Sequence, residues 1–333
     1  MKRSAAVHFR FCGKTFHSCG GPGGISHNRT VLDFLYHTVP GRMLLKLLVC
    51  PGVSKAAGFF LSSGLSAFLV PWYVGKHQID MREMEIPEGG FSSFNAFFTR
   101  KRKEERISPA DGSLISPCDG FLSCVEIRDG VVFDIKNTKY SLRDLLKDDR
   151  LADRFRNGMA YIFRLTPSDY HRYCYAADGR ILFGRRIPGK LHCVRPVALR
   201  NVPVFVQNSR EYQAFATKRF GTIVQMEVGA LLVGKIHNHN SLKRHGRVKA
   251  GDEKGYFEFG GSTIILLLEE GAVRFREALY ERQNEQWEMP VRLGEVIGME
   301  EEERLMDEKK GQAYTEGDAP SGYLFTAMQC DSL

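Results

Sequence analysis

The chain has 333 residues, of which 43% are hydrophobic and 26% charged, and its formal net charge at pH 7 is +8. The hydrophobic content excludes an intrinsically disordered protein and suffices for one globular domain with a sizeable core. Residues 1–110 hold 15 Lys and Arg against 7 Asp and Glu, so the whole positive excess lies in the N-terminal third and predicts attraction to an anionic surface.

The N-terminal residues predict a flexible leader, residues 1–27, rather than a metal site. His8, Cys12, His17 and Cys19 have the residue types of metal ligands, but their spacing is poor. The eight cysteines of the chain show no Cys-x-x-Cys spacing and no secretory leader precedes them. We therefore expect reduced thiols in a cytosolic compartment.

Residues 28–105 contain two apolar segments, at 43–49 and 56–74, each accompanied by a lysine. Such segments fit helices that lie on a membrane with basic side chains at the head groups. The second is about long enough to span a bilayer, but polar residues and Pro71 interrupt it. An interfacial or core helical layer is therefore favoured over a true span.

A basic run, Arg100-Lys101-Arg102-Lys103, follows the second segment. It fits anionic lipid, or simply a solvated helix end. Nucleic acid is not predicted as a partner, because no motif that reads nucleic acid accompanies the run.

Residues 106–298 favour a β-rich domain of the α+β class. Short apolar runs separated by turn signals predict strands at 121–127, 131–135, 161–165, 179–183, 204–207, 221–228, 231–236, 255–259 and 264–268. Few connections are long enough for βαβ crossovers, which indicates an antiparallel, sandwich-like domain. One helix is expected from an N-cap at Ser141 to about Asp153. Residues 299–333 are interpreted as a charged C-terminal tail.

The most informative motif is Phe259-Gly260-Gly261-Ser262-Thr263, directly before an apolar strand. If Ser262 Oγ attacks the carbonyl carbon of Gly261, the peptide becomes an ester, and elimination from that ester leaves a pyruvoyl group on the new N-terminus. The two glycines supply the backbone freedom that the distorted intermediate needs. Alone, Gly-Gly-Ser-Thr is also typical of an ordinary turn before a strand.

Four further segments accompany this motif: Phe-Asn-Ala-Phe-Phe-Thr-Arg at 94–100, Leu-Ile-Ser-Pro-Cys-Asp-Gly at 114–120, Asp-Tyr-His-Arg-Tyr-Cys at 169–174 and Val-Gly-Ala-Leu-Leu-Val-Gly-Lys-Ile at 228–236. Together with the Gly-Gly-Ser-Thr site they resemble the phosphatidylserine decarboxylase family of pyruvoyl enzymes. The resemblance runs from about residue 94 to residue 298 and is highly specific.

The resemblance implies a proenzyme that cleaves itself between Gly261 and Ser262. The products would be a β chain, residues 1–261, and an α chain, residues 262–333, which stay associated. Ser262 would become the pyruvoyl cofactor, with no pyridoxal phosphate and no metal, and the enzyme would convert phosphatidylserine into phosphatidylethanolamine. The family further implies a homodimer. With the basic, apolar N-terminal third, we expect a peripheral enzyme on the cytoplasmic face of the cell membrane.

The resemblance also assigns site residues. Asp119 matches the aspartate of the family's charge relay and is preferred over the near-copy at Asp111. His171 is the first histidine of the family's Tyr-His-Arg-x-His pattern, but the second histidine is replaced by Cys174. Three explanations are open: His171 serves both steps, Cys174 acts as a thiolate, or a histidine of the Ile236–His239 segment, His237 or His239, enters the site.

Other classes of function remain as alternatives. A serine hydrolase could use Ser262, His171 and Asp119 as a triad, although the Gly-x-Ser-x-Gly elbow is absent from this site. A non-catalytic membrane-binding module would stay uncleaved. A family relative could also decarboxylate a free amino acid, which the lipid-facing N-terminal third disfavours.

Overall fold

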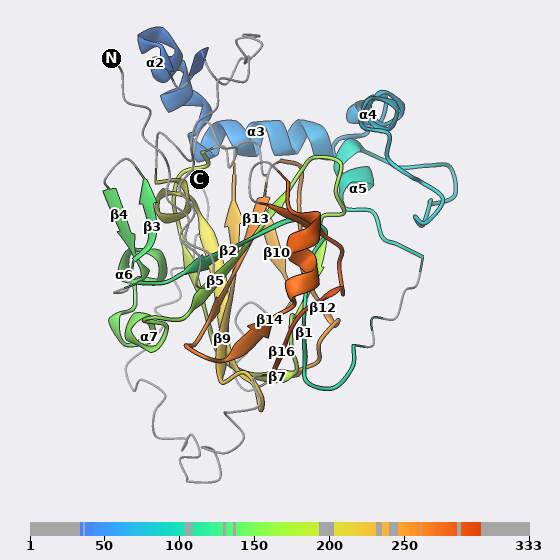
Figure 1. Ribbon diagram of the computed structural model, residues 1–333. Coiled ribbons are helices and arrows are strands. Elements are labelled where there is room, and N and C mark those ends of the chain that lie inside the picture. The colour runs from blue at the N-terminus through green and yellow to red at the C-terminus, as the bar shows by residue number, and fades with distance from the viewer. Residues whose placement is uncertain are drawn as a thin grey trace. The chain divides into compact units, whose positions relative to one another are not determined.

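An eight-stranded antiparallel sheet organises the chain (Figure 1), with the strand order β11-β7-β8-β9-β13-β5-β2-β15. The computed structural model describes residues 34–35, 37–103, 107, 109–128, 131–135, 138–192, 203–230, 235–239, 246–260, 262–284 and 288–300. The leader expected at 1–27 lies outside them, as does all but the first two residues of the expected tail. The sheet is formed by β2 (Gly120–Glu126), β5 (Met159–Leu165), β7 (Gly179–Ile187), β8 (Arg210–Ala216), β9 (Thr222–Gly229), β11 (Arg247–Val248), β13 (Ser262–Leu268) and β15 (Met289–Val291).

Three smaller antiparallel sheets accompany the large sheet in the part of the chain that the structure describes. The first joins β1 (Ser113–Ile115), β16 (Val296–Glu300) and β14 (Val273–Phe275). The second joins β10 (Ile236–Asn238), β12 (Glu253–Phe257) and β6 (Arg172–Cys174), and the third is the pair β3 (Val131–Ile135) and β4 (Thr138–Ser141). Side chains from the first two sheets, such as Ile297 and Phe257, belong to the same hydrophobic core as the large sheet.

The centre of the core lies at β13, where every residue is buried. A strand covered on both faces gains from apolar side chains at every position, which explains its continuous run of Ile and Leu in place of an alternating pattern. Each fully buried Leu or Ile contributes about 1.5–3 kcal/mol to folding. β13 therefore anchors Ser262, its first residue, to the best packed part of the molecule.

The helices are short: α2 (Val39–Leu48), α3 (Pro51–Ser62), η1 (Gly64–Ser66), α4 (Leu69–His77), α5 (Phe94–Phe98), α6 (Leu142–Leu146), α7 (Asp149–Arg154), α9 (Val204–Gln207) and η2 (Glu277–Arg282). Among the described residues, we find no helix with the length and apolar character needed to cross a membrane. Residues 56–74, expected to form helices, are divided among α3, η1 and α4.

An aromatic cluster connects the N-terminal helices to the rest of the chain. Tyr73 of α4 and the α5 residues Phe94, Phe97 and Phe98 are buried together, and Phe259 packs against them. Ser93 begins α5 by accepting a hydrogen bond from the backbone N–H of Ala96. α5 is thereby fixed beside the segment that leads into Ser262.

The sequence prediction of an α+β fold with mainly antiparallel sheets is confirmed, but two local predictions are wrong. Residues 204–207 form helix α9 and not a strand, because Pro203 immediately precedes a single helical turn with its φ at −73°. The helix expected from Ser141 to Asp153 is two helices. Ser141 is the N-cap as expected, but Lys147 adopts a left-handed conformation and Asp148 caps a new helix.

Candidate active site

Ser262 and Asp119 lie at the same end of the large sheet. Ser262 pairs with Leu165 of β5 and with Gly229 of β9. On the other side of β5, Gly120 approaches so closely that a Cβ would lie 2.6 Å from the Arg164 carbonyl oxygen, and its φ is +140°. Only glycine fits there without strain. The close approach of Gly120 to β5 places the preceding residue, Asp119, near Leu165, the residue that pairs with Ser262.

The Ser262 hydroxyl is fully buried and forms no hydrogen bond with any described residue. Such an orphaned polar atom is costly in a folded protein, so it indicates a functional requirement. Gly260 has a φ of +144°, a conformation open in practice to glycine alone. Gly261, the other residue of the expected cleavage site, lies outside the described residues.

The segment before Ser262 is held by α5. The backbone N–H of Phe259 donates to Asn95 Oδ1 over 3.2 Å, and Asn95 Nδ2 donates to Ser62 Oγ of α3 over 2.9 Å. The Phe259 ring packs edge-on against Phe94 and Phe98, with centroids 5.1 and 5.2 Å apart. The N-terminal helices thus position the segment that contains the expected cleavage site.

His171 is fully buried beside this segment. Its ring centroid lies 4.1 Å from that of Phe98, and its carbonyl accepts a hydrogen bond from the Phe257 N–H. Its Nδ1 lies 2.8 Å from the Asp169 carbonyl oxygen. A carbonyl can only accept, so Nδ1 carries the proton and Nε2 keeps its lone pair.

His171 is also held in its neutral form. Burial lowers its pKa from 6.5 to about 3, the Asp169 hydrogen bond opposes this, and the positive charge of Arg100 lowers it further. Nε2 has no hydrogen-bond partner among the described residues. An unprotonated, unpartnered nitrogen can act as a general base.

Asp119 is bound by Arg102 and not by His171. Arg102 Nη2 lies 2.5 Å from Asp119 Oδ2, and the Leu293 N–H donates to Asp119 Oδ1 over 2.8 Å. The Arg102 guanidinium also lies over the ring of Tyr170, the neighbour of His171, at 4.6 Å. Asp119 is thus linked to the His171 segment through Arg102 and Tyr170. Asp111, the near-copy, has an exposed side chain that pairs with Arg219.

Cys174 lies in β6 and is fully buried. Its Sγ is 3.9 Å from the Ser116 carbonyl oxygen, and burial raises its pKa from 9.0 to about 12. The side chain is therefore a thiol at neutral pH. A thiolate base at this position is disfavoured on physical grounds.

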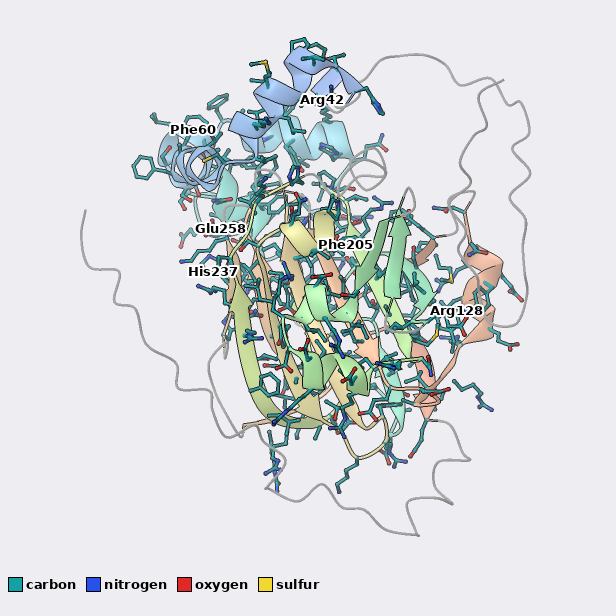
Figure 2. All side chains as sticks on the ribbon, turned by 90° about the vertical axis from the view of Figure 1, so that its left-hand side faces the viewer. Arg42, Phe60, Arg128, Phe205, His237 and Glu258 are labelled. Atoms are coloured by element: carbon teal, nitrogen blue, oxygen red, sulfur yellow. The ribbon has the colours of Figure 1, made fainter. Side chains whose placement is uncertain are left out.

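The two other candidate histidines lie on β10 and directly after it. His237 lies beside Glu258 (Figure 2), with Nε2 2.7 Å from Glu258 Oε1. Its ring stacks on Tyr256 with centroids 4.6 Å apart. His239 Nε2 is 2.6 Å from Glu253 Oε1. Within the described ranges, neither histidine forms a hydrogen bond with Ser262 or His171.

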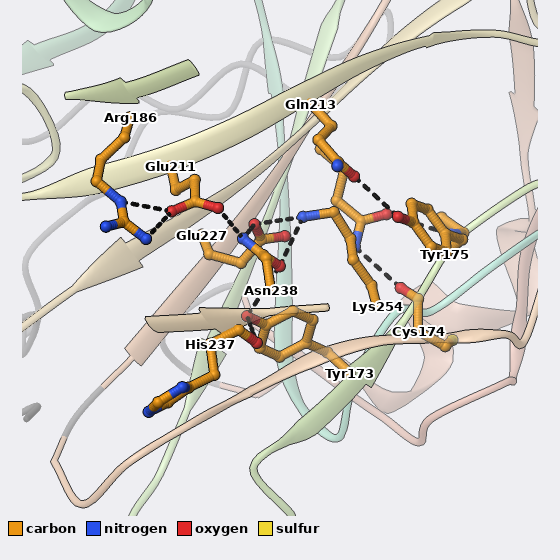
Figure 3. Close-up of polar contacts among 12 residues, drawn as sticks. Tyr173, Cys174, Tyr175, Arg186, Glu211, Gln213, Glu227, His237, Asn238 and Lys254 are labelled. Atoms are coloured by element: carbon orange, nitrogen blue, oxygen red, sulfur yellow. Dashed lines mark hydrogen bonds and ion pairs between the residues drawn. The ribbon is translucent and has the colours of Figure 1, made fainter. Parts of the chain in front are cut away.

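A buried polar network ties together the strands that carry this segment (Figure 3). Lys254 Nζ of β12 contacts Glu227 Oε2 of β9 at 2.5 Å and Asn238 Oδ1 of β10 at 3.1 Å, and Asn238 donates to Glu211 Oε1 of β8. Arg186 of β7 pairs with Glu211 from the outer side. β12, the strand that delivers the chain to Ser262, is thereby fixed to the large sheet. This network was not predicted from the sequence, although charged residues inside otherwise apolar strands signal it.

Arg100 and Arg102 were also not predicted as site residues from the sequence. In the basic run, Arg100 is buried and Arg102 half-buried, whereas Lys101 and Lys103 are exposed. This alternation is typical of an extended segment with one buried face. The interpretation as a solvated helix end is wrong for Arg100.

Comparison with known proteins agrees with these motifs. The model of a family described as phosphatidylserine decarboxylase matches residues 94–299. Phosphatidylserine decarboxylase proenzyme 2 of Clostridium acetobutylicum is 43% identical over 270 residues, which cover 80% of this chain and 91% of that protein. The phosphatidylserine decarboxylase proenzymes of Ruminiclostridium cellulolyticum and Clostridium kluyveri are both 38% identical over 273 residues, covering 80% of this chain and 90% and 92% of those proteins.

Proposed function

The chain belongs to the phosphatidylserine decarboxylase family, and we propose that it converts phosphatidylserine into phosphatidylethanolamine with a pyruvoyl group made from its own Ser262. The observation that carries the proposal is the Ser262 hydroxyl, which is fully buried and without a partner in the described part of the chain. It directly follows the two glycines that a strained acyl transfer needs.

The groups at this end of the sheet support a route for self-cleavage. Ser262 Oγ attacks the carbonyl carbon of Gly261 while His171 Nε2 takes the hydroxyl proton, and the backbone nitrogen of Ser262 leaves with a proton. Elimination from the resulting ester releases Gly261 as a carboxylate. Addition of water to the dehydrated residue and loss of ammonia then leave the pyruvoyl group on the α chain. Asp119 pairs with Arg102, which lies over the ring of Tyr170, so it supports the position of the His171 segment without contact with His171 itself.

The same residues suit decarboxylation. The pyruvoyl group supplies the electron sink for loss of carbon dioxide. His171 Nε2 takes a proton from the substrate ammonium group and returns it to Cα after the carboxylate has left. The rings of Phe94, Phe98 and Phe259 exclude water from this place, which favours loss of the substrate carboxylate.

The two chains stay together for a physical reason. β13, which begins at Ser262, is hydrogen-bonded between β5 and β9, both of which belong to the β chain. Its seven residues are buried in the core, so separating the chains would expose that core to water.

The two small sheets that share this core support the sandwich-like description of the catalytic domain, residues 106–298.

The N-terminal region, residues 28–105, suits a peripheral membrane-binding role. Large apolar side chains project into solvent from its helices, among them Phe59 at 82%, Leu65 at 76%, Phe68 at 71% and Trp72 at 58% exposure. Lys76 Nζ lies 4.7 Å from the Trp72 ring. Aromatic side chains beside basic ones are typical of interfacial helices, which supports peripheral membrane binding. From the basic N-terminal third we further propose the cytoplasmic face of the cell membrane, and from the family resemblance a homodimer.

The decisive experiment is a denaturing gel with intact-mass analysis of the purified protein. We expect a large and a small chain, with a pyruvoyl group at the N-terminus of the small one, and conversion of phosphatidylserine to phosphatidylethanolamine. Ser262→Ala should give a single chain with no decarboxylase activity, because the acyl shift requires the hydroxyl. A wild-type chain that stays intact and hydrolyses esters would support the serine hydrolase instead.

A further inference from the structure

Arg100 is a buried cation, and no carboxylate in the described part of the chain forms an ion pair with it. The residue is 3% exposed and follows the end of α5. Among the described residues, its Nη1 reaches only the Phe97 carbonyl oxygen at 3.4 Å, and its Nε has no hydrogen-bond partner. Its guanidinium lies over the Phe97 ring at 4.8 Å. No described carboxylate lies within ion-pair distance of it. Burial of an unpaired guanidinium costs folding free energy, so its presence here indicates a binding role.

The surroundings of Arg100 leave positive charge unbalanced. The Asp119 carboxylate forms an ion pair with Arg102 and accepts a hydrogen bond from the Leu293 N–H. Asp169 accepts a hydrogen bond from the Thr166 N–H, and burial raises its pKa. His171 is neutral, and the charge of Arg100 is one reason for its lowered pKa. Arg100 is therefore close enough to influence His171, while the charge of Asp119 acts on Arg100 only from beyond ion-pair distance.

The backbone holds Arg100 in place. Arg172, the residue after His171, donates from Nε to the carbonyl oxygens of Thr99 and Arg100, over 2.9 and 3.3 Å. Arg172 is itself paired with Glu253 of β12. The position of Arg100 is thus tied to the His171 segment and to the strand that leads to Ser262.

We propose that Arg100 binds the phosphodiester oxygens of the phosphatidylserine head group. This inference rests on the proposed function and adds a substrate-binding residue to it. A planar guanidinium with several N–H donors matches a phosphate oxyanion well. The phosphodiester keeps its charge throughout the reaction, so the interaction orients the substrate without opposing the chemistry.

The substrate carboxylate is the less suitable partner. It loses its charge when carbon dioxide leaves, so an ion pair to it would stabilise the ground state more than the transition state and slow the reaction. Arg100 on the phosphate leaves the carboxylate free to face the aromatic cluster. Arg100 is 3% exposed in the uncleaved chain, so the proposed binding requires that the head group gains access to it once the chain is cut.

The test compares Arg100→Gln and Arg100→Lys with Arg128→Gln, a control whose exposed side chain pairs only with Glu126 among the described carboxylates. Each variant is assayed with phosphatidylserine in mixed detergent micelles, and rates are normalised to the pyruvoyl content measured by mass spectrometry. Loss of one charge-assisted interaction should raise KM about tenfold to hundredfold in Arg100→Gln, with a smaller change in kcat. Arg100→Lys should recover part of the loss, and Arg128→Gln should match the wild type.

Two soluble inhibitors distinguish the oxyanion that Arg100 binds. Glycerophosphoethanolamine carries the phosphodiester without the carboxylate, and L-serine carries the carboxylate without the phosphate. We expect Arg100→Gln to weaken inhibition by glycerophosphoethanolamine and to leave inhibition by serine unchanged. The reverse pattern, or an unchanged KM in both Arg100 variants, would overturn the proposal while leaving the decarboxylase function intact.

Maturation is followed separately on the gel. If Arg100→Gln stays uncleaved, the KM and inhibition measurements on Arg100→Lys decide. If both variants stay uncleaved, Arg100 has a structural role and the proposal fails. If the wild type itself carries no pyruvoyl group, the proposed function fails.

Discussion

The Nδ1 atom of His171 lies 2.8 Å from the backbone carbonyl oxygen of Asp169. This contact fixes the tautomer that leaves Nε2 as a base, a role usually given to a carboxylate in a catalytic triad. A backbone carbonyl orients the ring but offers less charge to stabilise an imidazolium ion. His171 is therefore oriented as a base, but its protonated form is only weakly stabilised.

The first prediction concerns the pH dependence of self-cleavage. The pKa of His171 is lowered from 6.5 to about 3, chiefly by burial. Nε2 therefore stays unprotonated as pH falls through 6.5, and protonation begins to slow cleavage only as pH approaches the lowered value. We expect the cleavage rate of pulse-labelled, freshly synthesised chain to change less than about twofold between about pH 8 and about pH 5. A rate that halves near pH 6.5 on a time-resolved gel would show that the base is a solvated histidine.

Local sequence patterns could predict which residues, Ser262 and Asp119, belong to this site, but not which side chains contact them. Ser262 at the start of an apolar strand and Asp119 before Gly120 were recognisable, because glycine positions and strand runs are local signals. The contacts of His171 with Asp169 and of Asp119 with Arg102 depend on how the loops at this end of the sheet fold together. The position of Arg102 was visible only as one member of a basic run.

Strand β8 shows the same limit for the fold. Its residues are almost all buried, yet Glu211 and Gln213 break the apolar pattern. Their side chains bond to Asn238 and Tyr175 inside the protein. Polar residues that satisfy each other in the interior look like surface residues in a single sequence, and this strand was therefore not predicted.

The second prediction concerns the Arg102–Asp119 pair, whose side chains are 20% and 13% exposed. Removing one partner of a buried pair costs about 3–5 kcal/mol, whereas an exposed pair is worth at most about 1 kcal/mol. Arg102→Gln in the uncleaved Ser262→Ala chain should therefore lower the free energy of unfolding in urea by more than an exposed pair and less than a fully buried pair would, between about 1 and about 5 kcal/mol. Arg128→Gln in the same background, which breaks an exposed pair, is the control. Equal unfolding free energies for the two variants would contradict the importance of the Asp119 contact.

The third prediction concerns Cys174, which stands where the family pattern has a second histidine. Its thiol is buried and its pKa is raised to about 12, so it holds its proton at neutral pH and cannot serve as the base. We expect Cys174→Ala to mature within about twofold of the wild-type rate. Loss of a true general base would slow cleavage about 10²–10⁴-fold. A slowing of that size on a time-resolved gel would show that the thiol takes part.

The fourth prediction separates the two forces that bring the N-terminal region to a membrane. Phe59 and Phe68 are exposed apolar side chains, and Arg42 and Lys46 are exposed basic ones. The double variant Phe59→Ser with Phe68→Ser should weaken co-sedimentation with phosphatidylserine-containing liposomes at every salt concentration, because burial of apolar surface is not screened.

The matched double variant Arg42→Gln with Lys46→Gln should lose affinity mainly at low salt. Each basic residue near an anionic surface contributes about 1 kcal/mol, and mobile ions screen that attraction at physiological ionic strength. The two variants should therefore differ in the slope of binding against salt as well as in affinity. Liposome binding that neither double variant changes would show that other residues attach the enzyme to the membrane.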